Sequence, residues 1–547
     1  MSTPILRFAP LALSCVSLAC SALPWPQWDE CESAGCGSTS TDSPSETTTP
    51  TTGASGVQTV TGDVDEAGST SSGPGTETSG EPADEPPAIV GFELTPDPIQ
   101  FNGPITVSAT AEHADGIRMQ LGAGDPIELD ALAPGVFAGE IVIYSGLDNG
   151  PRFALLTPWR ATTDGETVEA PYTIALPEPG SEGHWETGNT IGQGQIAAMG
   201  VLPGGDVIEL GTLFTNDGAR CYVRRRDKGG AWKMSDVVPI FPGDACSALD
   251  LTVDPQGAMF VLVNRKVGNQ TRWWLARIPA WQAEPEIVDK GDEAETAVAL
   301  AAHPSGTVAA CLFAPTPALD DDARVRIYRP NLPGETRTFD YQPPDNLPHR
   351  FSERTRDCVL AGDVLALVGE MNGKHGMEDK PRNRMFIARI DTNDPGVPVW
   401  NVALPDVHTQ SGAQAAAVDG LGHLVVAGIV CDDDCQPEGE LRTYGLQGDL
   451  ADVKSLGTFP TEGFAVQDVA WSPAGYAVVA TGGEKGSEAA FTVRAFDPEK
   501  VEPVWTYVRA DGGVLHLALA LAIGKYGEVY AGGFGENGYP AVAYIGG

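Results

Sequence analysis

Apolar and polar residues repeat one pattern between Gly205 and Gly527. In each copy an apolar strand ends in a turn centred on glycine, and a second apolar run rich in Val or Ala follows, as in PSGTVAAC (304–311). The copies are spaced by roughly 50–60 residues, a period typical of the blades of a β-propeller. The glycines that centre the seven turns are Gly205, Gly257, Gly306, Gly362, Gly422, Gly475 and Gly527.

The last copy of the repeat ends one strand short of a four-stranded blade. Trp185 precedes the first copy in the way that Trp400 precedes the fifth and Trp505 the seventh. Pairing of 183–188 with 539–546 supplies the missing strand and removes an exposed sheet edge. The pattern therefore predicts an all-β fold with a seven-bladed propeller over 183–547, with six or eight blades as alternatives.

Residues 88–178 form a separate predicted unit. Seven short segments alternate apolar and polar residues, and Gly, Pro, Asp and Asn separate them. This is the pattern of an immunoglobulin-like β-sandwich. The unit has no cysteine, so the disulfide found in antibody domains is absent. We expect it to act as a spacer.

Residues 21–87 consist mainly of Ser, Thr, Gly, Pro and acidic residues. Such a segment buries too little apolar surface to offset the entropy of ordering, so we expect a disordered tether. A flexible chain of this length spans on the order of 45 Å by random-coil scaling.

Residues 1–20 predict an export signal, because Arg7 precedes an apolar stretch that ends near Leu18. Ala19 and Cys20 resemble the bacterial lipobox, in which an invariant cysteine receives the lipid, although Leu18 lies one place nearer to the cysteine than in that pattern. The resemblance implies lipidation at Cys20 and, with Ser21 following, the outer membrane or cell surface. A weaker competing site at Cys15 and ordinary secretion to the periplasm or beyond are the alternatives.

The chain carries a formal net charge of −40. Nucleic acids and anionic lipid headgroups bind through Lys and Arg, so this charge disfavours both as partners. After the N-terminus no segment reaches the roughly 20 apolar residues that span a bilayer. We therefore expect contact with a membrane only through the lipid anchor.

Ten cysteines are present, and those beyond the signal fall into near neighbours. In an exported protein such spacing predicts disulfides. Zinc is the alternative for the last pair, but no second pair of ligands lies nearby. The candidate pairs are Cys31 with Cys36, Cys221 with Cys246, Cys311 with Cys358, and Cys431 with Cys435.

The segments 388–400 and 495–505 contain Ala-x-Asp followed by Trp, with a looser copy at Asp227, Gly230 and Trp232. They resemble the docking repeat of quinoprotein-like propellers, in which Trp stacks between blades. Catalytic members carry a quinone, a calcium site and, in some alcohol dehydrogenases, adjacent cysteines. This chain has no Cys-Cys pair and no residues that match a calcium site, so we predict no cofactor, metal or catalytic residue. Non-catalytic relatives include the propeller lipoprotein of the outer-membrane barrel-assembly machinery.

Four long connections, expected at 313–323, 341–357, 371–384 and 431–440, open on one face of the propeller. Two of them are locally cationic in an anionic protein, and long loops on a rigid scaffold are where binding usually occurs. We therefore predict a surface there for an acidic partner protein or a glycan, with unselected loop variation as the alternative. The candidate residues are Arg350, Arg354, Arg356, Lys374, His375, Lys380, Arg382 and Arg384.

Together these patterns predict an exported, lipid-anchored envelope protein with a non-catalytic binding, scaffold or adhesion role. One alternative is a propeller enzyme, either a quinoprotein-like dehydrogenase or a polysaccharide lyase or hydrolase. A second alternative is a factor for outer-membrane protein assembly. Clustered carboxylates, His or metal in the central channel would favour the enzyme, and an apolar channel would favour binding. The sequence predicts neither the ligand nor the oligomeric state.

Overall fold

The computed structural model describes residues 85–547 apart from short gaps. Its regular elements are β-strands and one short 3-10 turn, η2 (Glu536–Gly538). In the part of the chain that it describes, no helix is long and apolar enough to cross a membrane. The gaps are 122–125, 144–148, 189–190, 228–231, 293, 304, 316–320, 330–333, 340–350, 374–381, 393–397, 404–409, 432–436, 460–465, 483–489 and 510–515.

Eight strands make up the N-terminal β-unit, and they pair in the order β1-β2-β5-β4-β3-β6-β7, with β8 on the free side of β6. Their inward residues form one apolar core that includes Ile105, Ile117 and Leu156. The strands are β1 (Ala88–Thr95), β2 (Gly103–Glu112), β3 (Gly116–Leu121), β4 (Ile127–Ala133), β5 (Val136–Ile143), β6 (Gly150–Arg160), β7 (Thr163–Asp164) and β8 (Val168–Ile174).

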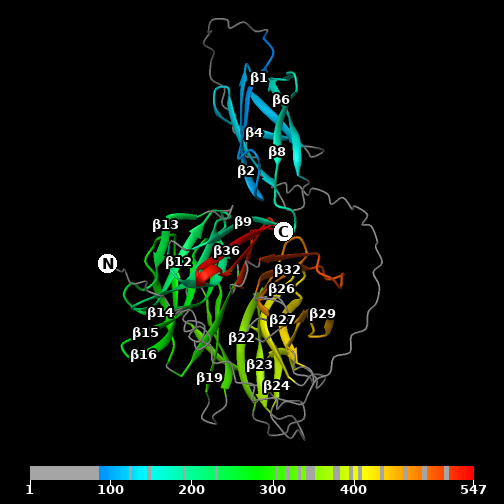
Figure 1. The fold of residues 1–547 in the computed structure, drawn as a ribbon. Helices are drawn as coiled ribbons and strands as arrows, with labels where there is room; N and C mark the ends of the chain where they lie inside the picture. Colours follow the sequence, from blue (N-terminus) through cyan, green and yellow to red (C-terminus); the bar gives the residue numbers. More distant parts are fainter. Residues whose placement is uncertain are drawn as a thin grey trace, which may run out of the picture. The chain divides into compact units, whose positions relative to one another are not determined.

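The rest of the described chain is a seven-bladed β-propeller of four-stranded antiparallel sheets (Figure 1). Blade 1 comprises β10 (Gly194–Val201), β11 (Val207–Thr215), β12 (Gly218–Arg226) and β13 (Trp232–Pro239). Blade 2 comprises β14 (Ala245–Val253), β15 (Met259–Val267), β16 (Gln270–Ile278) and β17 (Glu286–Lys290). Blade 3 comprises β18 (Thr296–Ala302), β19 (Val308–Pro315), β20 (Asp321–Tyr328) and β21 (Glu335–Phe339). Blade 4 comprises β22 (Phe351–Ala361), β23 (Val364–Gly373), β24 (Arg382–Asp391) and β25 (Pro398–Ala403).

The other three blades follow the same order from the centre outward. Blade 5 comprises β26 (Gln410–Val418), β27 (Leu424–Cys431), β28 (Pro437–Tyr444) and β29 (Leu450–Thr458). Blade 6 comprises β30 (Val466–Trp471), β31 (Ala477–Thr481), β32 (Phe491–Phe496) and β33 (Trp505–Arg509). Blade 7 comprises β34 (Leu517–Ile523), β35 (Val529–Phe534), β36 (Pro540–Ile545) and, from the start of the propeller, β9 (Glu182–Thr187).

The propeller closes by pairing its first strand with its last. β9 lies antiparallel to β36, with Trp185 opposite Ala543 and Glu186 opposite Val542 (Figure 1, β36 in red). The segments expected to close the ring, 183–188 and 539–546, overlap these two strands. Glu186 also reaches the neighbouring blade, because Arg226 at the end of β12 donates to it at 2.8 Å.

Each interface between neighbouring blades holds its own apolar cluster. The second strand of a blade is therefore covered on both faces, and all eight residues of β27 are buried. This explains why these strands read as continuous apolar runs rather than alternating ones. Full burial of one Val or Leu side chain contributes about 1.5–3 kcal/mol, so each interface rests mainly on apolar burial.

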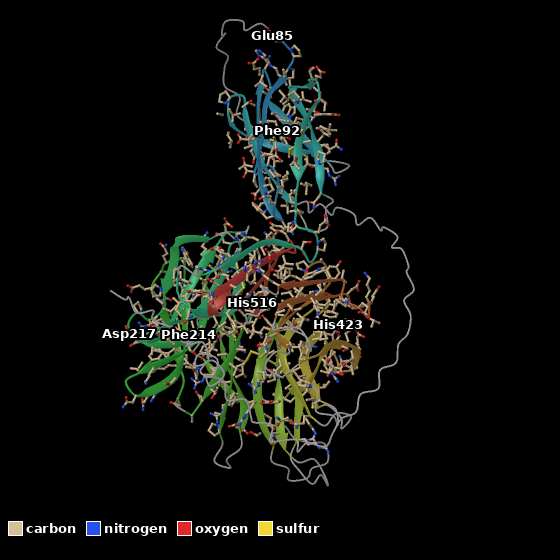
Figure 2. All side chains as sticks on the ribbon, in the orientation of Figure 1. Glu85, Phe92, Phe214, Asp217, His423 and His516 are labelled. Atoms are coloured by element: carbon tan, nitrogen blue, oxygen red, sulfur yellow. A yellow bond between two sulfur atoms is a disulfide. The ribbon has the colours of Figure 1, made fainter. Side chains whose placement is uncertain are left out.

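The glycine turns join the first and second strands of each blade. Gly475 has a φ of 91°, a left-handed conformation that glycine adopts without steric cost. Side chains three residues before the glycine fix several of these turns. In blade 5, where Figure 2 labels His423, Asp419 Oδ1 accepts from the N–H groups of Leu421 and His423, both at 2.8 Å, and its Oδ2 bonds His423 Nδ1.

Candidate functional site in the central channel

The inner strands β10, β14, β18, β22, β26, β30 and β34 contact one another in that order around the central channel. Each contains one extra residue where its pairing with the second strand shifts by one. Such a bulge redirects the neighbouring side chains. The residue after the bulge is Asp in blades 2, 4 and 6 and Ala in blades 1, 3, 5 and 7. These residues are Ala198, Asp250, Ala299, Asp357, Ala415, Asp468 and Ala520.

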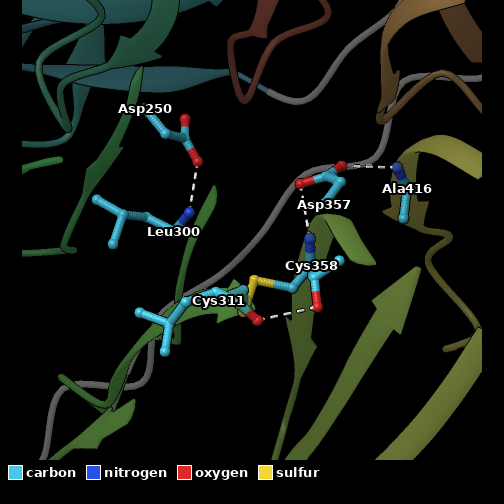
Figure 3. Close-up of a disulfide and its surroundings, with 8 residues drawn as sticks. Asp250, Leu300, Cys311, Asp357, Cys358 and Ala416 are labelled. Carbon is cyan, nitrogen blue, oxygen red and sulfur yellow. Dashed lines mark hydrogen bonds between the residues drawn. A yellow bond between two sulfur atoms is a disulfide. The ribbon is translucent and has the colours of Figure 1, made fainter. Parts of the chain in front are cut away.

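Each of the three aspartates joins two blades through backbone hydrogen bonds, and Figure 3 shows Asp250 and Asp357 with their donors Leu300 and Ala416. Oδ1 accepts from the N–H of the following residue, and Oδ2 accepts from an N–H on the inner strand of the next blade. Asp250 therefore connects blades 2 and 3, Asp357 connects blades 4 and 5, and Asp468 connects blades 6 and 7. The donors in the next blade are Leu300 at 2.5 Å, Ala416 at 2.7 Å and Leu521 at 2.7 Å.

The environment of these carboxyls disfavours their ionised form. Burial raises the pKa of Asp250 to about 7, and the negative charge of Asp357 adds to the effect. Burial likewise raises the pKa of Asp357 to about 6. The pKa of Asp468 lies well above its usual range because of burial first and then the charge of Asp357. The backbone donors oppose each rise without cancelling it.

The three aspartates line a cavity of about 340 Å³. The side chains of all three aspartates are half-buried, because they face this cavity. Arg356 also lines the cavity, but its Nη2 donates to Glu370 at 2.8 Å. Among the described residues, no group of three or more His, Cys, Asp or Glu side chains could hold a metal ion. Carboxylates are thus present in the channel, and each is engaged with the backbone.

Two residues assigned to a loop by the sequence lie on a strand instead. The expected loop 341–357 overlaps β22, which begins at Phe351, so Arg354 and Arg356 are strand residues. Arg354 Nε donates to Asp321 at 2.7 Å. Every residue from Glu353 to Asp357 on β22 except Thr355 is charged, and such a charged stretch resembles a loop in the sequence.

The expected loop 371–384 is likewise shorter, because β23 extends to Gly373 and β24 begins at Arg382. Arg382 is half-buried. Arg384 is buried and donates from Nη1 to the carbonyl of Gly373 at 3.1 Å. Both are therefore part of the hairpin rather than of its tip. The remaining candidates, Arg350, Lys374, His375 and Lys380, lie outside the described residues.

The expected connections 313–323 and 431–440 are also shortened at both ends by strands. β19 ends at Pro315 and β20 begins at Asp321, whereas β27 ends at Cys431 and β28 begins at Pro437. The hairpins of blades 3, 4 and 5 nevertheless turn at the same end of their blades, because each joins a second strand to a third strand.

Two predicted disulfides are present, and both connect neighbouring blades. Cys221 on β12 is bonded to Cys246 on β14, with Cα atoms 5.4 Å apart. Cys311 on β19 is bonded to Cys358 on β22, with Cα atoms 6.4 Å apart (Figure 3). These bonds indicate an oxidising, exported environment. Cys431 is buried at the end of β27, whereas Cys435, Cys20, Cys31 and Cys36 lie outside the described residues.

Trp505 of the proposed docking repeat and Trp185 of the closing strand pack at the same blade interface. Trp505 is buried in the apolar cluster between blades 6 and 7, and Trp185 packs against the same cluster. Arg509 lies over the ring of Trp185, 4.4 Å from its centroid. Nothing further is described of the Trp400 and Trp232 side chains.

No protein-family model and no curated protein matches the chain. Similar solved structures include Sqt1 from Chaetomium thermophilum, with 15% identity, a TM-score of 0.38, and coverage of 65% of this chain and 82% of that one. A protein of unknown function from Bacteroides thetaiotaomicron has 8% identity, a TM-score of 0.31 and coverage of 85% and 98%. A Hadza microbial sialidase, Hz136, has 10% identity, a TM-score of 0.36 and coverage of 83% and 95%. At these values no property of the three proteins is transferred to this chain.

The sequence prediction named Arg356, as a loop residue, but none of the three channel aspartates, although a signal for them was available. When the repeats are aligned on their turn glycines, position −7 is Ala in blades 1, 3, 5 and 7 and Asp in blades 2 and 6. Blade 4 has a shorter turn, so Asp357 stands at position −5 from Gly362. This offset hides the third aspartate from a fixed-spacing comparison.

Proposed function

We propose that the chain is an exported, non-catalytic binding protein whose propeller recognises a partner protein or a glycan. Its binding surface is the face where the hairpins of blades 3, 4 and 5 turn. The disulfides between blades support an exported location. A rigid ring that presents hairpins on one face is a common scaffold for binding.

The proposal rests on the hydrogen bonds that the polar side chains in the channel already make within the protein. All three channel aspartates accept two backbone N–H groups each, from two blades, and Arg356 pairs with Glu370. These groups hold the ring together, so their presence in the channel is explained without a reaction. Carboxylates in the channel, which we expected to favour an enzyme, thus have a structural explanation in the backbone hydrogen bonds that they accept.

The binding face is proposed to be cationic in a protein of net charge −40. Arg354 and Arg356 are neutralised by Asp321 and Glu370, so they are weak candidates for contact with a ligand. Arg350, Lys374, His375 and Lys380 remain the proposed contacts. Cations in these connections would attract a partner with acidic groups, such as an acidic protein surface or an anionic glycan.

The N-terminal β-unit is proposed to be an immunoglobulin-like spacer. The paired strands β1-β2-β5-β4 and β3-β6-β8 follow the ABED and CFG orders of that fold, and this supports the assignment. Residues 21–87 are proposed as the tether and Cys20 as its lipid anchor in the outer membrane or at the cell surface.

The test uses the full-length protein on an array of envelope glycans and in crosslinking to envelope proteins. A double variant, Arg350→Glu with Lys380→Glu, is expected to lose at least about tenfold in affinity for the captured ligand. Lys266→Glu is the matched control, because Lys266 is an exposed cation near the corresponding hairpin of blade 2. Equal binding by the double variant and the control would contradict the proposed face. Turnover of a captured glycan would contradict the non-catalytic role.

A further inference from the structure

The three channel aspartates share one cavity with few compensating charges. The charged or titratable residues that line it are Asp250 on β14, Arg356 and Asp357 on β22, and Asp468 on β30. The other strands around it, β10, β18, β26 and β34, contribute only Ala, Val, Leu, Met and Gln to the lining. Arg356 is paired with Glu370, and the three aspartates line one cavity without an ion pair to any of them among the described residues.

Two effects compete when one of these carboxyls ionises. A charged carboxylate strengthens its two hydrogen bonds from the backbone, which favours ionisation. Loss of solvation and repulsion between the carboxylates disfavour it. The second effect is larger here, because the pKa of every one of the three lies above the ordinary value of an aspartate.

We propose that Asp250, Asp357 and Asp468 form a proton-linked device at the centre of the ring. Near neutral pH the folded channel retains protons between the blades, and a rise in external pH charges the channel and weakens cohesion of the inner strands. Because the carboxyls interact, they titrate as a group rather than as independent sites.

The direction of the pH effect follows from proton binding. An aspartate in the unfolded chain releases its proton at about pH 4, whereas Asp250 in the folded ring does so at about pH 7. Between these values the folded state binds more protons than the unfolded state. The contribution of these groups to stability is therefore greatest below about pH 4 and falls as the pH rises through this window.

The experiment compares the full-length protein with a triple variant, Asp250→Asn, Asp357→Asn and Asp468→Asn, by potentiometric titration in the folded state. The wild type is expected to release about one to two protons more per molecule between pH 5 and pH 8. Its unfolding midpoint in urea should also fall more steeply with pH than that of the variant. Asn keeps the size of the side chain. A loss of stability that is the same at every pH does not change the slope of the unfolding midpoint against pH, so the slope reports the titrating groups alone.

Asp254→Asn is the matched control, because Asp254 also accepts two backbone N–H groups but lies in the turn of blade 2 outside the cavity lining. It separates the effect of losing a cavity aspartate from that of losing another buried aspartate of the same blade. If the triple variant does not fold, the single variant Asp250→Asn replaces it in the experiment. This variant should lack the proton that the wild type releases at about pH 7. Titration curves of wild type and channel variants that superimpose, or an equal change in the control, would overturn the proposal.

Discussion

Arg226 in blade 1 bridges the strand that closes the ring and a buried glutamate of its own blade. Its Nη1 donates to Glu186 on β9 at 2.8 Å, and its Nε donates to Glu209 on β11 at 2.9 Å. The side chains of Arg226 and Glu209 are fully buried. The closing strand is therefore joined to blade 7 by backbone pairing and to blade 1 by this ion pair.

Replacement of Arg226 by Ala is expected to reduce the free energy of unfolding by about 3–5 kcal/mol, because it leaves buried carboxylate charge without one of its partners. Arg225→Ala is the control, since the adjacent Arg225 pairs with Asp206 in a half-exposed position and should contribute at most about 1 kcal/mol. Urea unfolding of both variants measures the difference. Similar losses in the two would show that the closing ion pair has no special role.

Removal of the disulfide between blades 3 and 4, by Cys311→Ser with Cys358→Ser, should destabilise the propeller by about 3–4 kcal/mol. The bond closes a loop with a sequence separation of 47 residues, against 25 for Cys221–Cys246. On the entropic account, the longer loop gives the larger loss. Thermal unfolding with and without reductant tests this expectation. Cys221→Ser with Cys246→Ser is the comparison and should lose less stability, and an equal or larger loss there would contradict the loop-length argument.

Substitution of Gly475 by Ala should cost about 1–2 kcal/mol, because the left-handed backbone at this turn places a Cβ against the following carbonyl. No other atom lies within 4 Å of the added Cβ, so backbone strain is the only cause. Gly204→Ala is the matched control, since it has equal space without a positive φ. Chemical denaturation should show the control unchanged or slightly stabilised. An equal loss at both sites would refute the strain argument.

The proposed lipid anchor predicts that Cys20→Ser releases the protein from the membrane fraction. A lipidated cysteine supplies the hydrophobic anchor, and the rest of the chain is not expected to replace it. Cys15→Ser serves as control, because Cys15 is the competing site in the same segment. Fractionation and immunoblotting of expressing cells give the readout. Release by the control alone would move the anchor to Cys15.

The number of blades was predictable because the same short pattern, a glycine turn between two apolar strands, recurs in every blade. A turn with positive φ demands glycine, and the apolar runs on both sides of Gly257 or Gly422 must be buried against neighbouring blades. These constraints act over a few residues, so they are visible in a single sequence. Pairing of Cys221 with Cys246 was predictable for the same reason, since the two are near neighbours in the chain.

The residues that line the channel and the ends of the hairpins were not predicted, because they depend on contacts between residues that are distant in sequence. Asp468 accepts from Leu521 in the next blade, and only alignment with the other repeats, not its own segment, marks it as a channel position. Arg354 sits in a charged stretch, yet Asp321 provides its partner from another blade. Such assignments require the register between blades, which local pattern does not contain.

The aspartate links join blades two by two, and seven is an odd number. Blade 1 is therefore the member without an aspartate–backbone link on either side. Its neighbours are attached by other chemistry, a disulfide from Cys221 to Cys246 on one flank and the Arg226–Glu186 pair on the other. Blade 1, where the circle of strands begins and ends, therefore has a covalent bond on one flank and a buried ion pair on the other.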